Sequence, residues 1–178
     1  MMTTEQALKK FYAALHLCAL LVPVLSPVSG HTQVFQESYD WKEGEVPPPP
    51  AYDTGKLLTF KLGAASMLVY GVDPASISIS KADSVVRYVM VATSESGARN
   101  VMYEGLRCAT GEFKTYARQT GGTWQAVSNP EWRSVFDRMP SPHALVFARM
   151  AACDARAPAG NVAEIVSKMK NPNQYLDQ

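Results

Sequence analysis

Seven short apolar segments lie between residues 56 and 127, and they constrain the fold more than any other feature of this 178-residue chain. They span residues 57–62, 67–72, 77–79, 84–93, 98–108, 112–118 and 123–127. Gly97, Gly111 and the Gly121-Gly122 pair separate several of them, where tight turns need glycine. No gap between them is long enough for a crossover helix. The order therefore predicts an antiparallel meander.

Helix signals appear only after this region. Asn129-Pro130 and Ser141-Pro142 each place a capping residue before a proline, and Asn161 precedes a third apolar periodicity. These signals predict helices over residues 129–139, 144–153 and 162–170, the first with Trp132, Val135, Phe136 and Met139 on one buried face. Strands followed by helices predict an α+β fold. We expect a mostly antiparallel sheet of five to seven strands, with C-terminal helices packed on it and one disulfide.

The first 30 residues resemble a secretory signal peptide. Lys9 and Lys10 precede an apolar run over residues 11–25, and Val28-Ser29-Gly30 supplies small residues for cleavage. The run is shorter than the roughly 20 residues that a membrane span needs. We expect an exported protein in the periplasm or at the cell surface, with no transmembrane span after cleavage.

The rest of the chain divides into three parts by composition. We predict a proline-rich leader over residues 31–55, a single domain over 56–172 and a tail over 173–178. From His31 onward the chain carries 15 acidic and 15 basic side chains, which argues against a nucleic-acid partner. The leader contains Pro47-Pro48-Pro49-Pro50 and is either a stiff arm or a segment laid along the domain with Trp41 and Tyr52 as anchors.

Two cysteines, Cys108 and Cys153, remain after the signal segment, which contains Cys18. In an oxidising compartment such a pair is expected to form a disulfide, and the alternative is two separate buried thiols. Two cysteines and a single nearby histidine, His143, provide too few ligands for a structural zinc ion, which takes four. We therefore expect no metal and no cofactor.

No catalytic motif is evident, so we predict that the protein is not an enzyme. Ser141 and His143 are close in sequence, but Ser141 is explained as a helix cap. Glu104 and Glu112 flank Cys108 and are the carboxylates that a glycosidase-like reaction could use. A cell-wall hydrolase using Glu104 is therefore one alternative function.

Strand alternation suggests a candidate binding face. If the strands over residues 98–108 and 112–118 are regular, one sheet face presents Tyr103, Arg107, Lys114, Tyr116 and Arg118. Tyrosine and arginine are favoured at binding hot spots. The alternatives are a solvated face or a face covered by a helix. Arg87 shares its parity with Val89 and Val91 and fits a polar face poorly.

Several motifs resemble a known family. They are Trp41-Lys-Glu-Gly-Glu, the proline run, Tyr103-Glu-Gly-Leu-Arg-Cys108, Lys114-Thr-Tyr-Ala and Trp132-Arg133. Together they resemble the CNP-one-like family, secreted proteobacterial proteins of unknown function. The order of segments also resembles, more loosely, the surface-adhesin protein E domain, a disulfide-tied sheet with helices that binds host matrix proteins. That resemblance implies a bridge between Cys108 and Cys153.

These observations predict a secreted cell-envelope protein, a non-catalytic binding or structural module. Its partner would be a protein or an envelope component, recognised by the tyrosine and arginine face or by strand addition at a sheet edge. The first alternative is an adhesin-like protein that binds host matrix. The second is the hydrolase with Glu104.

Overall fold

A computed structural model describes residues 41–63 and 66–172. The predicted signal peptide, the first part of the predicted leader and the predicted tail over 173–178 lie outside the described residues. The strands are β1 (Leu58–Lys61), β2 (Leu68–Val72), β3 (Ser78–Ile79), β4 (Val85–Ser94), β5 (Arg99–Arg107), β6 (Glu112–Thr120), β7 (Thr123–Ala126), β8 (Arg133–Ser134), β9 (Cys153–Asp154) and β10 (Ala157–Pro158). The helical elements are η1 (Pro74–Ser76), α2 (His143–Phe147), the π-helix η2 (Ala148–Ala152) and α3 (Val162–Lys170).

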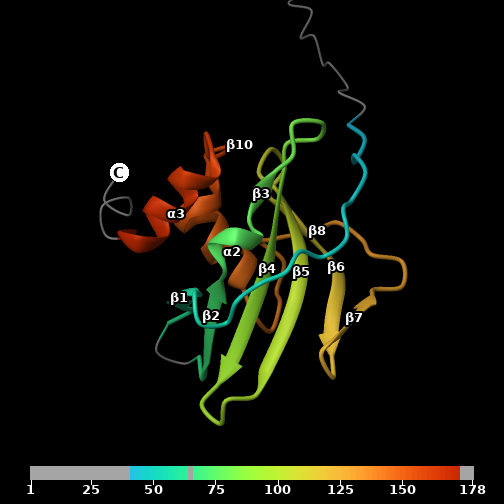
Figure 1. Cartoon of the computed structure of the whole chain (residues 1–178). Helices are drawn as coiled ribbons and strands as arrows, with labels where there is room; N and C mark the ends of the chain where they lie inside the picture. The colour runs from blue at the N-terminus through green and yellow to red at the C-terminus, as the bar shows by residue number, and fades with distance from the viewer. Residues whose placement is uncertain (1–40, 64–65, 173–178) are drawn as a thin grey trace, which may run out of the picture. The chain divides into compact units, whose positions relative to one another are not determined.

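The main sheet is an antiparallel meander (Figure 1), in the order β1-β2-β4-β5-β6-β7. The short strands β3 and β8 pair with β4 and β6. Gly121 and Gly122 form the tight turn between β6 and β7, and both have positive φ, which suits a two-residue hairpin. The α+β prediction, with helices at the C-terminal end, is therefore confirmed.

Both faces of the central strands are covered. The first eight residues of β4 are buried without interruption, which explains why this strand is rich in valine rather than alternating. On one side, which we call the helix face, Tyr88, Met90 and Leu106 pack in one core with residues of α2, η2 and α3. On the other side, the leader face, Val89 and Tyr103 belong to a second core, against which Val46 and Tyr52 of the leader pack together with Leu57 and Trp124.

The C-terminal helices follow two of the three predicted segments. Asn161 caps α3, because its side chain accepts a hydrogen bond from the backbone N–H of Glu164 at 2.9 Å. The predicted helix over residues 129–139 is wrong. Asn129 adopts a left-handed conformation with φ of 50°, and β8 interrupts the segment. Val135 is buried while Phe136 is 65% exposed, so the expected apolar stripe does not form.

Cys108 and Cys153 form the predicted disulfide, with Cα atoms 5.6 Å apart. Cys108 directly follows β5, and Cys153 begins β9 after η2. The bridge therefore attaches the helical part of the chain to the end of a central strand.

Replacing both cysteines by alanine should lower the free energy of unfolding by about 4 kcal/mol, because the bridge closes a loop of 45 residues in the unfolded chain. Urea denaturation of the oxidised protein and the double variant measures this difference. Reduced wild-type protein is the control and should match the double variant. A free energy of unfolding that does not change on reduction would contradict the prediction.

Candidate functional site

The five residues of the predicted binding face do not share one side of the sheet. Tyr103 and Tyr116 lie on the leader face, 2% and 8% exposed, and Lys114 reaches the same side. Arg107 lies at the strand end, paired with Glu112 at 3.3 Å. Arg118 is exposed and lines a pocket on the helix face together with Glu104. The expectation of one shared face is therefore wrong for Arg118.

An irregularity in β6 causes this difference. Tyr103 pairs with Ala117 while Glu104 pairs with Thr115, so Tyr116 is an extra residue in its strand. Strand alternation is shifted by one position beyond this point. Gly105 makes room for it, because a Cβ atom there would lie 2.3 Å from the Tyr116 hydroxyl oxygen. A glycine inside a strand, such as Gly105, is typical of a bulge. The position of the extra residue, however, depends on the register with the paired strand and could not be inferred from the glycine alone.

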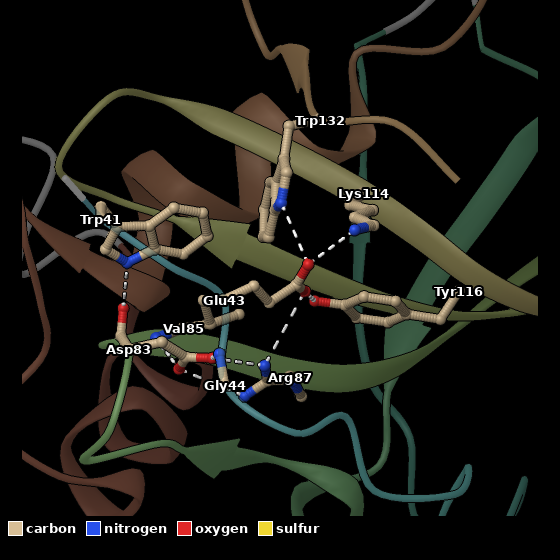
Figure 2. A network of polar contacts seen from close by, with 9 residues as sticks. All are labelled: Trp41, Glu43, Gly44, Asp83, Val85, Arg87, Lys114, Tyr116 and Trp132. Carbon is tan, nitrogen blue, oxygen red and sulfur yellow. Dashed lines mark hydrogen bonds and ion pairs between the residues drawn. The ribbon is translucent and has the colours of Figure 1, made fainter. Parts of the chain in front are cut away.

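The leader covers the leader face and fixes a carboxylate there (Figure 2). Glu43 accepts hydrogen bonds from Lys114 Nζ and the Tyr116 hydroxyl, both at 2.6 Å, and from Trp132 Nε1 at 3.3 Å. The guanidinium of Arg87 lies 3.9 Å away. Burial is the main reason why the pKa of Tyr116 is raised, and the hydrogen bond to Glu43 raises it further. Residues 41–53 therefore lie along the domain, which is the second of the two alternatives for the leader, and do not form a separate stiff arm.

A second buried carboxylate anchors the same segment. Asp83 forms an ion pair with Arg87 at 2.6 Å and accepts a hydrogen bond from the backbone N–H of Gly44 at 2.9 Å. Trp41 donates to the Asp83 carbonyl oxygen at 3.0 Å, and its ring stacks under Arg107 with 3.8 Å from Cζ to the centroid. Burial opposes ionisation of Asp83, but the hydrogen bonds from Arg87 and from backbone N–H groups outweigh it and lower its pKa to about 2.

Four of the five predicted residues therefore face the chain's own leader: Tyr103 lies in the core against which Val46 and Tyr52 pack, and the other three make polar or ring contacts. Tyr116 and Lys114 bind Glu43, and Arg107 contacts Trp41. A partner that used this face would have to displace residues 41–53. The binding role of the face stays a prediction.

Replacing Glu43 by glutamine should lower the free energy of unfolding by about 3 kcal/mol, because Lys114 would remain partly buried without its carboxylate partner and Arg87 would keep only Asp83. Chemical denaturation measures the change, and limited proteolysis should cut the leader faster in the variant. Glu45→Gln is the matched control, because Glu45 is exposed two residues away. Equal losses in the two variants would contradict the role given to Glu43.

The stability should also depend on pH through Asp83. Its pKa is lowered from 3.8 to about 2, so its stabilisation is complete above pH 4 and is lost as the pH falls through 2. The loss should amount to about 2 kcal/mol. Denaturation curves between pH 2 and pH 5 measure it. The variant Asp83→Asn should lack this part of the acid dependence, whereas exposed Asp137→Asn should retain it.

A pocket of about 690 Å³ opens on the helix face. Strands β2, β4, β5 and β6 provide one side through residues such as Tyr70, Ala92, Met102 and Phe113. The segment between β7 and α2 provides the other side through Val127, Met139 and Ser141, among others. The volume lies within the range of small-molecule sites, about 300–1,000 Å³.

A buried ionisable pair borders this pocket. His143 Nε2 lies 3.0 Å and 3.1 Å from the two carboxylate oxygens of Glu104, and Thr115 donates to Glu104 at 3.2 Å. Glu104 is fully buried and His143 is 7% exposed. Burial lowers the pKa of His143, but the charge and hydrogen bond of Glu104 outweigh burial and raise it. His143 Nδ1 lies 2.9 Å from Ser141 Oγ, which also donates to the Tyr70 hydroxyl at 2.8 Å.

The charged side chains at the pocket are mostly positive. Arg99, Arg118 and Arg133 line it and are exposed, and Glu131 is the exposed acidic residue beside them. Within the described chain, none of these arginines forms an ion pair with a carboxylate. This excess contrasts with the nearly balanced charge of the whole sequence.

The sequence paired Ser141 with His143 but did not join Glu104 to them. The prediction that Ser141 caps the helix is wrong, because Pro142 flanks α2 and no side chain caps it. Glu104 is 39 residues before His143, so only the fold joins them. Residues 41–63 and 66–172 contain no group of three or more histidine, cysteine or acidic side chains that could hold a metal ion.

Comparison with known families identifies the chain. The model of the CNP1-like family (the CNP-one-like family of the motifs above) matches residues 36–170, which is most of the sequence. The chain therefore belongs to the CNP1-like family. No curated protein and no solved structure matches it significantly. The resemblance to the surface-adhesin protein E domain stays a prediction. In the part of the chain that the structure describes, no helix is long and apolar enough to cross a membrane.

Proposed function

We propose that this protein is an exported cell-envelope protein whose pocket on the helix face binds a small amphipathic anion. The single observation that carries the proposal is the 690 Å³ pocket with three unpaired arginines among the described residues. The signal-peptide features of residues 1–30 support export. A ligand can bind in this pocket without displacing the leader. A partner that used the predicted tyrosine and arginine face would have to displace it.

The chemistry of the pocket favours an apolar body with an acidic group. Leu68, Met102, Phe113 and Met139 offer apolar contact area, which favours burial of an apolar ligand. Arginine matches carboxylate, sulfonate and phosphate groups with two parallel N–H donors.

The probe for this proposal is 8-anilinonaphthalene-1-sulfonate, which joins an aromatic body to one sulfonate. Its fluorescence should rise on binding to the folded protein, and dodecanoate should displace it. Arg118→Gln should raise the Kd about tenfold, because a charged hydrogen bond contributes about 1.5 kcal/mol. Titration calorimetry with dodecanoate gives the same comparison without a fluorophore.

Arg149→Gln is the matched control, because Arg149 is an exposed arginine beside Phe136 and outside this pocket. It should leave the Kd unchanged. Absence of saturable binding by the folded wild-type protein would refute the proposal. Equal weakening by both substitutions would show that binding is not at this pocket.

A further inference from the structure

Three side chains beside the pocket form an unbroken line of hydrogen bonds. Ser141 Oγ contacts His143 Nδ1 at 2.9 Å, and His143 Nε2 contacts both oxygens of Glu104 at 3.0 and 3.1 Å. Glu104 comes from β5, His143 is the first residue of α2, and Ser141 lies two residues before that helix. All three residues line the pocket, and Ser141 is the least buried of them.

We propose that Ser141, His143 and Glu104 form the reactive centre of an esterase. Ser141 is the nucleophile, His143 is its general base and Glu104 is a positioning residue that fixes the imidazole. The substrate class is a carboxylic ester with an apolar acyl chain. This substrate class rests on the proposed function, because the acid released would be an amphipathic anion of the kind that the pocket is inferred to bind. The proposal departs from the sequence-based prediction of a non-catalytic protein.

The arrangement contains each contact that a serine nucleophile needs. The nucleophile touches the base, and the base touches a carboxylate on its other nitrogen. The Tyr70 ring is stacked parallel to the imidazole at 5.4 Å and limits its rotation. In the structure, Ser141 Oγ donates its single proton to the Tyr70 hydroxyl. Attack by Ser141 therefore requires its hydroxyl to rotate, so that the proton points to His143 Nδ1, 2.9 Å from Oγ.

The reaction balances without any further reagent. Ser141 Oγ forms a bond to the ester carbonyl carbon, and its proton passes to His143 Nδ1. The bond from that carbon to the alcohol oxygen then breaks, and the alcohol leaves with the proton from His143. Water repeats the sequence on the acyl-serine, which releases the carboxylic acid and restores Ser141. Arg99, Arg118 and Arg133 line the same pocket and make its potential positive, which favours an anionic intermediate over a neutral one.

The charges around His143 predict a pH dependence. Glu104 from β5 is its ionic partner, Arg118 from β6 opposes its protonation, and Tyr70 from β2 covers its ring. His143 must be neutral to accept the proton of Ser141. Because the net effect of these neighbours is a raised pKa, the reaction should accelerate with pH until His143 is deprotonated.

The test uses diisopropyl fluorophosphate on the folded, disulfide-intact protein. Attack by Ser141 Oγ on phosphorus should expel fluoride and leave one covalent adduct, which intact-mass and peptide mass spectrometry place on Ser141. Hydrolysis of 4-nitrophenyl butyrate should be at least tenfold faster with wild-type protein than with Ser141→Ala. Ser78→Ala is the matched control, because Ser78 is exposed on β3, outside the pocket, and should keep the full rate.

Glu104→Gln tests the positioning role separately. It should slow labelling at least tenfold and move the rise in labelling rate to lower pH, because the carboxylate raises the pKa of His143. Wild-type protein that binds dodecanoate but gives no adduct on Ser141 would overturn the esterase and leave the binding function standing. Wild-type protein that neither binds dodecanoate nor reacts would overturn both. An adduct on another residue would also overturn the assignment to Ser141.

Discussion

The extra residue in β6 decides which side chains reach each face of the sheet. In a regular strand, Lys114, Tyr116 and Arg118 would all point the same way. Because Tyr116 is inserted opposite the Tyr103–Glu104 bond, Tyr116 and Ala117 both reach the leader face, and Arg118 moves to the helix face. This irregularity requires glycine at position 105, since a Cβ atom there would collide with the Tyr116 ring. One irregularity thus supplies a hydrogen-bond donor for Glu43 and a cation for the pocket.

The leader is held by side chains rather than by a strand ladder. Among the described residues, none of the strand pairs includes residues 41–53. Their attachment depends on two carboxylates, Glu43 and Asp83, that are surrounded by Arg87, Lys114 and aromatic rings. Removing charges from water is costly, so such a cluster is stable only when each group has a partner. The leader supplies Glu43, without which Lys114 would lose its carboxylate partner while Arg87 would keep Asp83. The segment is for this reason part of the folded domain's energetics and not only a spacer.

Structural features that depend on neighbouring residues could be predicted from the sequence. Features that depend on contacts between distant segments of the chain could not. The apolar segments, the Gly121-Gly122 turn and the Asn161 cap each depend on a few neighbouring residues, and the structure has them all. The helix expected over residues 129–139 did not form, since Trp132 is drawn to Glu43 on the leader face while Val135 enters the core on the helix face. The face of Arg118 depended on the register with β5. By strand parity, Arg87 fits a polar face poorly, because it alternates with Val89 and Val91. Its partners, Asp83 and Glu43, could not be inferred from that parity.

Two buried ion pairs among the described residues, Asp83–Arg87 and Glu104–His143, differ in what surrounds them. Asp83 and Arg87 are closed in by the leader, and their partners account for a purely structural role. Glu104 and His143 instead border the pocket, and the second nitrogen of the imidazole points to a hydroxyl that also lines it. A buried pair of this kind is seldom needed for stability, because apolar side chains of similar volume often serve as well. A carboxylate, an imidazole and a hydroxyl in line at a pocket are the arrangement on which the proposed transfer of a proton from Ser141 depends, and the packing of the domain does not by itself require it.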